Sequence, residues 1–332
     1  MNYSSFSQIF EAFNGLKVLI IGDVMIDSYQ WGKVERISPE APVPIVHVQQ
    51  REMRLGGASN VALNIQAMGG IPILCSVIGE DLDGDNFIKL LENNKLPIEG
   101  IIRKSSRVTT IKHRIISGSH HMLRVDSEID TPLIASDRNA LLERITGLIG
   151  QVDVIVFEDY DKGVIDKILI SDVVKSAKSA GKPIAVDPKK RNFMHYHGVD
   201  LFKPNLKEMK EGLKIDLHSD DMQELVSAVK ILKEKLSLEG ALLTLSERGV
   251  FIDLKNEQHH LPAHIRNISD VSGAGDTVIS VASLCLALGL SPRLIAGLSN
   301  LAGGLVCEYV GVVPIVKEEL LKEAEKELSL TE

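Results

Sequence analysis

Cysteine is scarce in this sequence, and its three residues, Cys75, Cys285 and Cys307, lie far apart without a C-x-x-C pair. This spacing excludes a disulfide framework or a zinc ribbon and fits a reducing compartment. No apolar run reaches the roughly 20 residues of a membrane span, and the N-terminus lacks the basic flank and apolar segment of a secretory signal. We therefore expect a cytoplasmic protein that is neither exported nor anchored.

An excess of positive charge is also missing. The chain has 37 Lys and Arg against 45 Asp and Glu, a net charge of −8, and only 4% aromatic residues. This balance argues against non-specific nucleic-acid binding. No G-x-G-x-x-G follows the first apolar run, and no G-x-x-x-x-G-K-[ST] is present, so neither a dinucleotide-dependent dehydrogenase nor a P-loop kinase is indicated. What remains is 332 residues, 44% of them apolar, which suffice for one large α/β domain.

Apolar runs alternate with helical patterns along the chain. The run KVLIIG, at 17–22, is typical of a strand buried on both faces. Residues 139–150 and 222–236 place their apolar side chains on one helical face. Further apolar runs that predict strands lie at 73–79, 153–158, 183–187, 200–204 and 241–245. This order predicts a doubly wound, mostly parallel sheet covered by helices on both sides, in a single domain over residues 1–332.

Two segments depart from this rhythm. Residues 29–55 and 111–126 alternate apolar and polar side chains, as antiparallel strands with one buried face do. We expect them to form a small sheet that projects from the core, covers a substrate crevice as a lid, or pairs with a second subunit.

The segment DVSGAGDTV, at 270–278, sets a turn of small residues before an apolar stretch. One interpretation is an N-capped helix, since Asp and Ser are good caps. The other is an anion hole, in which the backbone of Gly273, Ala274 and Gly275 presents N–H groups to a phosphate. Asp276 would repel that anion as a ligand, but it suits a base that takes a proton from an attacking hydroxyl. This combination indicates phosphoryl transfer.

The segment DVSGAGDT resembles the C-terminal signature of the PfkB/ribokinase family of carbohydrate kinases. GGASNVALNIQAMG, at 56–69, resembles the N-terminal signature, and the resemblance implies that Gly56, Gly57 and Asn60 contact the sugar. Without the family, the two glycines would simply form a turn before a helix. The family implies a ribokinase-like fold, and it places a sugar-binding acid at Asp27, which would otherwise be an ordinary surface residue.

Two further segments match the family. KPNLKE resembles its Asn-x-x-Glu motif, which implies that Asn205 and Glu208 help to hold Mg²⁺ and the triphosphate, with the metal bound to Glu208 through water. Alternatively, this segment ends a strand and begins a helix. TLSERG resembles a stretch that approaches the nucleotide and implicates Thr244, Ser246 and Gly249. A hairpin turn explains the same letters, and both readings can hold.

A narrower resemblance covers nearly the whole chain. It is to the kinases of this family that phosphorylate C1 of D-glycero-β-D-manno-heptose 7-phosphate for the lipopolysaccharide core. The segments that carry it are RISPEAPVPIV, GGASNVALNIQAMGG, RVTTIKHRII, MLRVD, DYDKGV and VDPKK. They contain Lys112, Arg114, Arg124 and Lys162, which are plausible ligands of the sugar phosphate or, alternatively, solvated surface charges.

This chain departs from that narrower pattern at two places. Ser119, His120 and His121 stand where Gln or Asn-Gln is expected, and Glu158 replaces a serine before Asp159 and Tyr160. Adjacent histidines are more typical of a loop than of a metal site, since neighbours on a strand face opposite ways. The departures concern sugar contacts and leave the kinase chemistry intact.

The resemblance also implies the cofactors and partners. These are ATP, Mg²⁺, a monovalent cation, a sugar phosphate and a second copy of the chain, joined as a homodimer through the lid. No His-x-Gly-His motif of an adenylyltransferase is present, so a kinase alone is expected. The alternatives are a related kinase for fructose 1-phosphate, tagatose 6-phosphate or a nucleoside, and a non-catalytic nucleotide-binding regulator, against which the intact Asp276 and its glycines argue.

Overall fold

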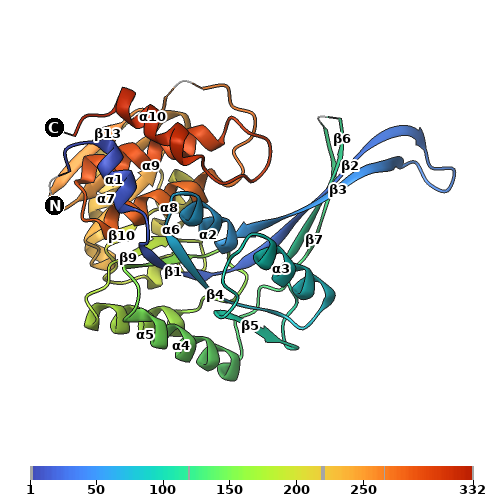
Figure 1. The fold of residues 1–332 in the computed structure, drawn as a ribbon, viewed down its shortest axis with the longest axis horizontal. Helices are drawn as coiled ribbons and strands as arrows, with labels where there is room; N and C mark the ends of the chain where they lie inside the picture. The colour runs from blue at the N-terminus through green and yellow to red at the C-terminus, as the bar shows by residue number, and fades with distance from the viewer. Residues whose placement is uncertain (1–2, 119, 218–220, 265, 331–332) are drawn as a thin grey trace.

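The computed structural model of the chain describes residues 3–118, 120–217, 221–264 and 266–330. Within these residues the chain forms a large sheet in the order β13-β12-β11-β10-β9-β8-β1-β4-β5 and a small sheet in the order β3-β2-β6-β7. Figure 1 shows the small sheet projecting away from the helix-covered body of the molecule.

The strands of the large sheet are β1 (Lys17–Gly22), β4 (Ile71–Gly79), β5 (Ile101–Lys104), β8 (Val154–Glu158), β9 (Ile184–Asp187), β10 (Leu201–Phe202), β11 (Gly240–Thr244), β12 (Val250–Leu254) and β13 (Glu257–Leu261). The strands of the small sheet are β2 (Val24–Ile37), β3 (Pro44–Gly57), β6 (Ile111–Ser117) and β7 (His120–Ser127). The α-helices are α1 (Phe6–Ala12), α2 (Ala58–Ala67), α3 (Leu82–Asn93), α4 (Ala135–Ile149), α5 (Lys167–Ser179), α6 (Leu206–Leu213), α7 (Met222–Leu236), α8 (Ala274–Ala287), α9 (Pro292–Val306) and α10 (Lys317–Glu327). Two short 3-10 helices are η1 (Phe193–His195) and η2 (Ser246–Arg248).

The large sheet is mostly parallel, as predicted. Neighbouring strands from β11 to β5 pair in parallel, and only β12 and β13 are antiparallel. Strand β8 is buried along its whole length, because helices cover both faces of the sheet. The apolar runs that predict strands lie in β1, β4, β8, β9, β10 and β11, so this part of the prediction is confirmed.

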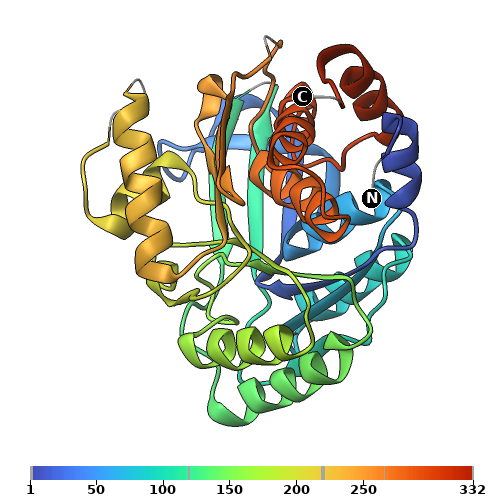
Figure 2. The ribbon, with the colours of Figure 1, turned by 90° about the vertical axis from the view of Figure 1, so that its left-hand side faces the viewer.

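Helices form two layers with separate apolar cores. Val18 and Ile20 of β1 pack with α1, α2, α8, α9 and α10, whereas Leu19 and Ile21 pack with α4, α5 and α7. Successive side chains of a strand point to opposite faces, so one apolar strand supplies both cores. Figure 2 shows the two layers on opposite sides of the sheet, with α8 and α9 in orange to red and α4 and α5 in green. The helices predicted at 139–150 and 222–236 are α4 and α7.

The small sheet contains the two predicted lid segments but differs in the direction of one pairing. Strands β2 and β3 form an antiparallel hairpin, as do β6 and β7, whereas β2 and β6 pair in parallel. The expectation of an antiparallel sheet throughout is therefore wrong for the contact that joins the two insertions. Side-chain alternation has the same period in both kinds of pair, so it cannot reveal strand direction.

The adjacent histidines also differ from expectation. His120 and His121 lie in strand β7 and not in a loop, and Ser119 lies outside the described residues. His121 pairs with Ile116 next to an irregularity in the β6–β7 register. The group of side chains that could hold a metal ion among the described residues contains no histidine.

The two faces of the lid sheet differ in character. One row of paired residues across the four strands consists of Arg54, Asp27, Lys112 and Asp126, and the next row consists of Met53, Ser28, His113 and Val125. Because neighbouring rows face opposite ways, the sheet has one charged face and one more apolar face. Among the described residues, no helix has the length and apolar character needed to cross a membrane.

Candidate active site

The turn before α8 lies against the carboxyl end of β9. Gly273 caps the helix in the left-handed conformation, with φ of +80°, and a Cβ there would lie 2.9 Å from Asn60 Nδ2. A Cβ on Gly275 would lie 3.6 Å from both Asp187 Oδ2 and Lys203 Nζ. The Ala274 amide donates a long bond of 3.3 Å to the Val271 carbonyl. The predicted anion hole therefore lies at the N-terminus of α8, which is the positive end of its dipole, beside the buried side chains of Asp187 and Lys203.

Asp276 joins the two signature segments. Its side chain is buried, its Oδ2 accepts a hydrogen bond of 2.8 Å from Asn60 Nδ2, and its Oδ1 accepts one of 2.7 Å from the Tyr160 hydroxyl. Asn60 comes from α2 and Tyr160 follows β8, so three distant parts of the chain meet at one carboxylate. The structure thus brings Asp276 and Asn60 together, as the resemblance implies.

Burial raises the pKa of Asp276 to about 6, although the hydrogen bonds from Tyr160 and Asn60 oppose the rise. Burial and the neighbouring Asp276 also raise the pKa of Tyr160 well above its ordinary value, so the hydroxyl keeps its proton and acts as a donor. A base with a pKa near the working pH is efficient, because it is ionised and still accepts a proton readily.

Asp276 belongs to a cluster of buried carboxylates. One oxygen each of Glu158, Asp187 and Asp276 lie within 4.8 Å of one another. Lys203 Nζ lies 2.8 Å from Asp187, and Lys189 Nζ lies 3.9 Å from Asp187. Glu158 and Asp187 end the neighbouring strands β8 and β9, at the sheet edge where ligands of open α/β sheets bind.

Glu158 is the unusual member of this cluster. Both of its carboxylate oxygens are buried, and neither has a hydrogen-bond partner among the described residues. Burial, together with repulsion from Asp187 and Asp276, raises its pKa well above the ordinary value. A buried polar group without a partner is costly and needs an explanation. Carboxylate oxygens are the ligands that Mg²⁺ prefers, so Glu158 and Asp187 fit a divalent cation.

The predicted sugar site lies where the lid meets the core. Asp27 on β2 is buried and forms an ion pair with Arg114 of β6. A Cβ on Gly56 would overlap Asp27 Oδ2, and a Cβ on Gly57, which has φ of +58°, would overlap the Asp23 carbonyl. Both glycines are therefore required by close approach of the chain, and a side chain at position 56 would displace the Asp27 carboxylate.

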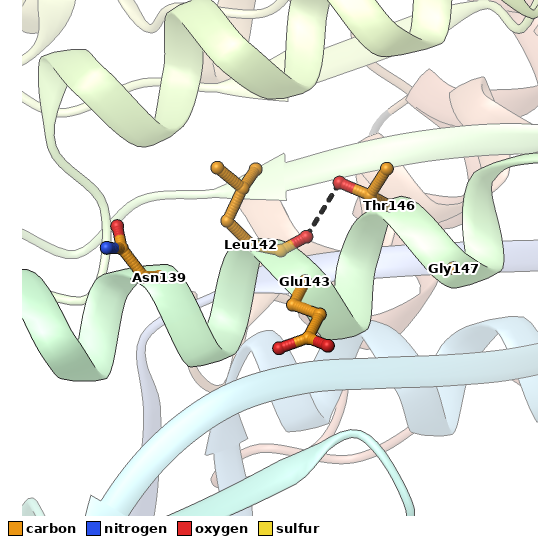
Figure 3. A pocket seen from close by; sticks show the side chains of 5 residues that line it. All are labelled: Asn139, Leu142, Glu143, Thr146 and Gly147. Atoms are coloured by element: carbon orange, nitrogen blue, oxygen red, sulfur yellow. Dashed lines mark hydrogen bonds between the residues drawn. The ribbon is translucent and has the colours of Figure 1, made fainter.

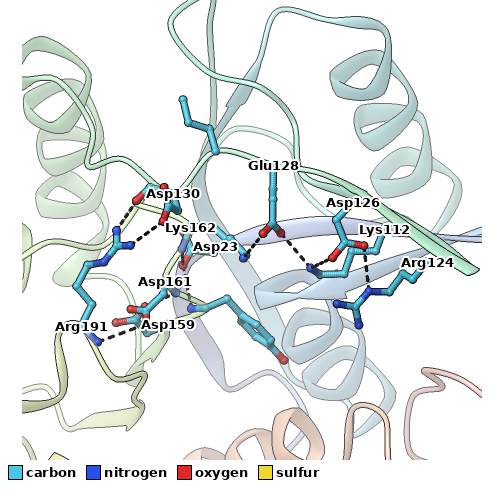
Figure 4. Close-up of polar contacts among 12 residues, drawn as sticks. Asp23, Lys112, Arg124, Asp126, Glu128, Asp130, Asp159, Asp161, Lys162 and Arg191 are labelled. Carbon is cyan, nitrogen blue, oxygen red and sulfur yellow. Dashed lines mark hydrogen bonds and ion pairs between the residues drawn. The ribbon is translucent and has the colours of Figure 1, made fainter.

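The other predicted cations lie on or beside the lid. Lys112 contacts Asp126 and Glu128, Lys162 contacts Glu128, and the exposed Arg124 contacts Asp126 (Figure 4). Lys112 and Lys162 therefore come together through one carboxylate. Lys112 also shares Asp126 with Arg124, whereas Arg114, the paired neighbour of Arg124 across β6 and β7, binds Asp27.

The predicted nucleotide segments also lie close together. Asn205 caps α6, and its capping box with Glu208 uses one oxygen of that glutamate, while the other binds Lys189 Nζ at 2.6 Å. Thr244 forms a bridge with Asn205. Ser246 lies in η2 with φ of +55°, and Gly249, with φ of +85°, allows the β11–β12 hairpin to pass the Leu261 carbonyl. The helix start and the hairpin turn are thus both real, and the nucleotide roles stay predictions.

Sequence reasoning did not assign Glu158, Asp187, Lys189 or Lys203 to the cluster, nor Tyr160 to the base. A signal existed for the two acids, because each is the last residue of an apolar run that predicts a parallel strand. Tyr160 carried no comparable signal, since its contact with Asp276 spans 116 positions.

A shallow depression of about 430 Å³ lies elsewhere, on α4 (Figure 3). Its lining consists of Asn139, Leu142, Glu143, Thr146 and Gly147. All five belong to one helix, and none is a predicted site residue. The Thr146 hydroxyl donates a hydrogen bond to the Leu142 carbonyl of the same helix. This surface is not a candidate for the substrate site.

Comparisons with known proteins agree with this geometry. A sequence profile described as "pfkB family carbohydrate kinase" matches residues 16–318. The bifunctional protein HldE of Caulobacter sp. (strain K31) is 41% identical over 311 residues, which are 93% of this chain and 63% of that protein. The bifunctional protein HldE of Helicobacter pylori (strain HPAG1) is 38% identical over 304 residues, 92% of this chain and 65% of that protein. The chain thus spans less than two thirds of the length of these relatives.

Solved structures show the same fold at lower identity. Phosphofructokinase-2 from Escherichia coli in complex with fructose-6-phosphate has a TM-score of 0.77 and 15% identity, with 95% of this chain and 99% of that chain covered. Arabidopsis thaliana ribokinase complexed with ribose and ATP has a TM-score of 0.71 and 17% identity, with 93% and 99% covered. The architecture is ribokinase-like, and since the profile spans most of the sequence, the chain belongs to the pfkB family of carbohydrate kinases, phosphotransferases that act on sugar hydroxyls.

Proposed function

We propose that this chain transfers the γ-phosphoryl group of ATP to the C1 hydroxyl of D-glycero-β-D-manno-heptose 7-phosphate and yields the 1,7-bisphosphate for the lipopolysaccharide core. The observation that carries the kinase chemistry is the buried Asp276 carboxylate, held by Asn60 and Tyr160 at the start of α8. The heptose substrate is supported by the matching segments along the chain and by the identity with HldE proteins over more than nine tenths of it.

In this reaction the C1 oxygen attacks the γ-phosphorus in line while the bond to the ADP oxygen breaks. Asp276 takes the proton of the C1 hydroxyl, and the negative charge leaves with ADP. Asn60 holds one oxygen of the Asp276 carboxylate in place. The other oxygen accepts from the Tyr160 hydroxyl, which must move away when the sugar hydroxyl binds there or share that oxygen with it. Positioning and charge neutralisation supply most of the catalysis in phosphoryl transfer.

The charged residues around the base have complementary tasks. Glu158 and Asp187 would hold Mg²⁺, with Glu208 and Asn205 beside them on the nucleotide side, and the bound metal supplies neutralisation of the triphosphate charge. The buried Lys203 and the partly buried Lys189 are cations next to these acids, suited to phosphate oxygens. Asp27, Gly56 and Gly57 would line the sugar below the lid.

The proposal is tested by ADP release from MgATP with D-glycero-β-D-manno-heptose 7-phosphate, measured beside fructose 6-phosphate, fructose 1-phosphate, ribose and adenosine. A strong preference for the heptose phosphate supports the assignment. Turnover with only one of the other acceptors would keep the Asp276 chemistry and overturn the heptose substrate.

The pKa of Asp276 makes the reaction sensitive to acid. The base works only when ionised, so kcat/KM should rise with pH through an acidic limb. Burial places the pKa at about 6 without a cation, and a bound cation beside the carboxylate lowers it. We therefore expect the limb at or below about pH 6 in a pH profile under saturating MgATP. A limb above about pH 7 would contradict the assignment of the base.

We also propose that two copies associate through the apolar face of the lid. Met53, Leu123 and Val125 on this face have exposed fractions of 40%, 54% and 48%. Leu123→Asp should therefore give a monomer in sedimentation velocity, whereas the exposed Leu82→Asp on α3 should leave the assembly unchanged. A monomeric parent protein, or a dimeric L123D variant, would refute this interface.

A monovalent cation and a cytoplasmic location complete the proposal. Escherichia coli phosphofructokinase-2, one of the structural neighbours, was solved in complex with potassium. A dependence of turnover on potassium, compared with tetramethylammonium at equal ionic strength, tests whether this chain uses a monovalent cation.

A further inference from the structure

A short chain of ion pairs joins the lid to the core. Lys112 of β6 and Lys162, in the loop after β8, both contact the carboxylate of Glu128, which follows β7. The distances are 3.1 Å from Lys112 Nζ and 2.8 Å from Lys162 Nζ. Figure 4 shows Glu128 between the two lysines, with one oxygen directed at each.

Both lysines border the proposed sugar site. Lys112 is the paired neighbour of Asp27 across the parallel β2–β6 contact, so both side chains point to the same face of the lid. Lys162 lies two residues after Tyr160, whose hydroxyl contacts Asp276. A sugar that reaches Asp276 with one end can thus extend its other end toward this pair of ammonium groups.

The backbone around Lys162 is fixed independently of Glu128. Its N–H donates to Asp23 Oδ2 at 3.1 Å, and its carbonyl accepts from Arg107 Nη2 at 2.5 Å. Lys112 has a second partner, Asp126, at 3.3 Å. If the Glu128 carboxylate moved away, the Lys112 ammonium group would therefore keep Asp126, and the backbone that carries Lys162 would keep its place.

Glu128 is the mobile candidate in this arrangement. Its side chain keeps 30% of its surface exposed, compared with 14% for Lys112 and 18% for Lys162. Burial alone would raise the pKa of Glu128, but the hydrogen bonds from Lys162 and Lys112 lower it below the ordinary value, so the group is ionised at neutral pH. Partly exposed ion pairs are weak, and a phosphate dianion is a stronger partner for two ammonium groups than one carboxylate.

We propose that Glu128 occupies the place of the substrate's phosphate group in the unliganded protein, and that the sugar phosphate binds Lys112 and Lys162 by displacing this carboxylate. The inference rests on the proposed function, because it assigns the phosphate end of that substrate. Glu128 is then a specificity-determining residue. A sugar without a phosphate or similar anion has to break the ion pairs of Glu128 with Lys112 and Lys162 and forms no ion pairs in their place.

The test measures binding of inorganic phosphate by titration calorimetry, with the nucleotide site filled by a non-hydrolysable ATP analogue and Mg²⁺. Glu128→Gln should tighten phosphate binding by about three- to tenfold, because two partly exposed ion pairs no longer have to be broken. Lys162→Met and Lys112→Met should weaken it. In turnover, Glu128→Gln should lower the KM for the sugar phosphate by a similar factor and leave kcat unchanged.

Two controls separate this effect from a general change of charge. Glu143→Gln removes an exposed carboxylate from α4 and should leave phosphate binding unchanged. Asp126→Asn removes the second carboxylate partner of Lys112 and leaves the Lys162 ion pair intact, so its effect should be smaller than that of Glu128→Gln. Unchanged phosphate affinity in Glu128→Gln, with lower thermal stability and a higher KM for every substrate, would show that Glu128 only fastens the lid, and would overturn the inference.

The calorimetry does not depend on which sugar the enzyme accepts. If the heptose phosphate is not a substrate but Glu128→Gln still tightens phosphate binding, the proposed function fails and the subsite stands. If the heptose phosphate is a substrate but substitutions of Glu128, Lys112 and Lys162 leave the affinity for phosphate unchanged, the proposed subsite is refuted and the proposed function stands.

Discussion

Replacing Asp276 by Asn lowers turnover by about 10²–10⁴-fold and leaves the affinity for ATP nearly unchanged, because the amide cannot take the proton of the attacking hydroxyl. The substitution keeps the size of the side chain. Its oxygen can still accept from Asn60, and its NH2 group can donate to the Tyr160 hydroxyl oxygen, which accepts as well as donates. The loss should therefore appear in kcat with little change in the KM for either substrate. Steady-state kinetics and calorimetric titration of the ATP analogue measure the two quantities.

The matched control is Asp172→Asn, on the partly exposed face of α5, for which full activity is expected. Thermal unfolding of both variants tests whether they remain folded. A D276N enzyme with near-normal turnover would remove Asp276 as the base and leave only the anion hole as a role for the turn.

Much of this site could be predicted because it depends on local sequence. The Gly-Ala-Gly turn before Asp276 and the Gly-Gly pair before Asn60 each combine a conformational requirement with a functional side chain. A parallel sheet brings its carboxyl ends to one edge, so motifs after different strands meet there. The contact between Asn60 and Asp276 lies outside that rule, because α2 follows β3 of the small sheet and α8 follows the antiparallel strand β13. The resemblance to the family is what placed both residues at the sugar.

The rest depends on long-range contacts that have no local pattern. Glu128 is an acidic residue after an exposed strand, and only the folded lid shows that two lysines from different elements share it. The parallel pairing of β2 with β6 likewise depends on how two insertions dock on the core. The orphaned carboxylate of Glu158 appears only when burial and the absence of a partner among the described side chains are seen together.

Glu158→Gln should raise the Mg²⁺ concentration needed for half-maximal turnover by about 10–100-fold, since the substitution removes a carboxylate that fits the metal. Saturating Mg²⁺ should restore part of the activity. Glu143→Gln, the exposed counterpart on α4, should leave the Mg²⁺ dependence unchanged. An unaltered Mg²⁺ titration in the E158Q enzyme would show that Glu158 does not hold the metal.

The same variant should change how stability depends on pH, which is measured without turnover. Burial raises the pKa of Glu158 in the folded protein well above 4.5, its value in the unfolded chain. Between these two pKa values the folded state holds a proton that the unfolded state has released. The free energy of unfolding of the metal-free protein therefore falls as pH rises through this window, by up to about 1.4 kcal/mol per pH unit for this group.

The amide introduced by E158Q cannot ionise, so in the variant this part of the slope should disappear. The contributions of the other buried acids should remain, among them Asp276, over the window from 3.8 to about 6, and Asp159, over the window from 3.8 to about 7. Mg²⁺ should stabilise the parent protein most at high pH, where Glu158 is forced to ionise, and should stabilise the E158Q protein much less. Urea unfolding at several pH values, with Mg²⁺ and with EDTA, separates the two effects. Equal slopes of unfolding free energy against pH in the two proteins would mean that other groups of the protein stabilise the ionised Glu158. The buried carboxylates would then be a structural acid cluster, with the metal held elsewhere along the nucleotide.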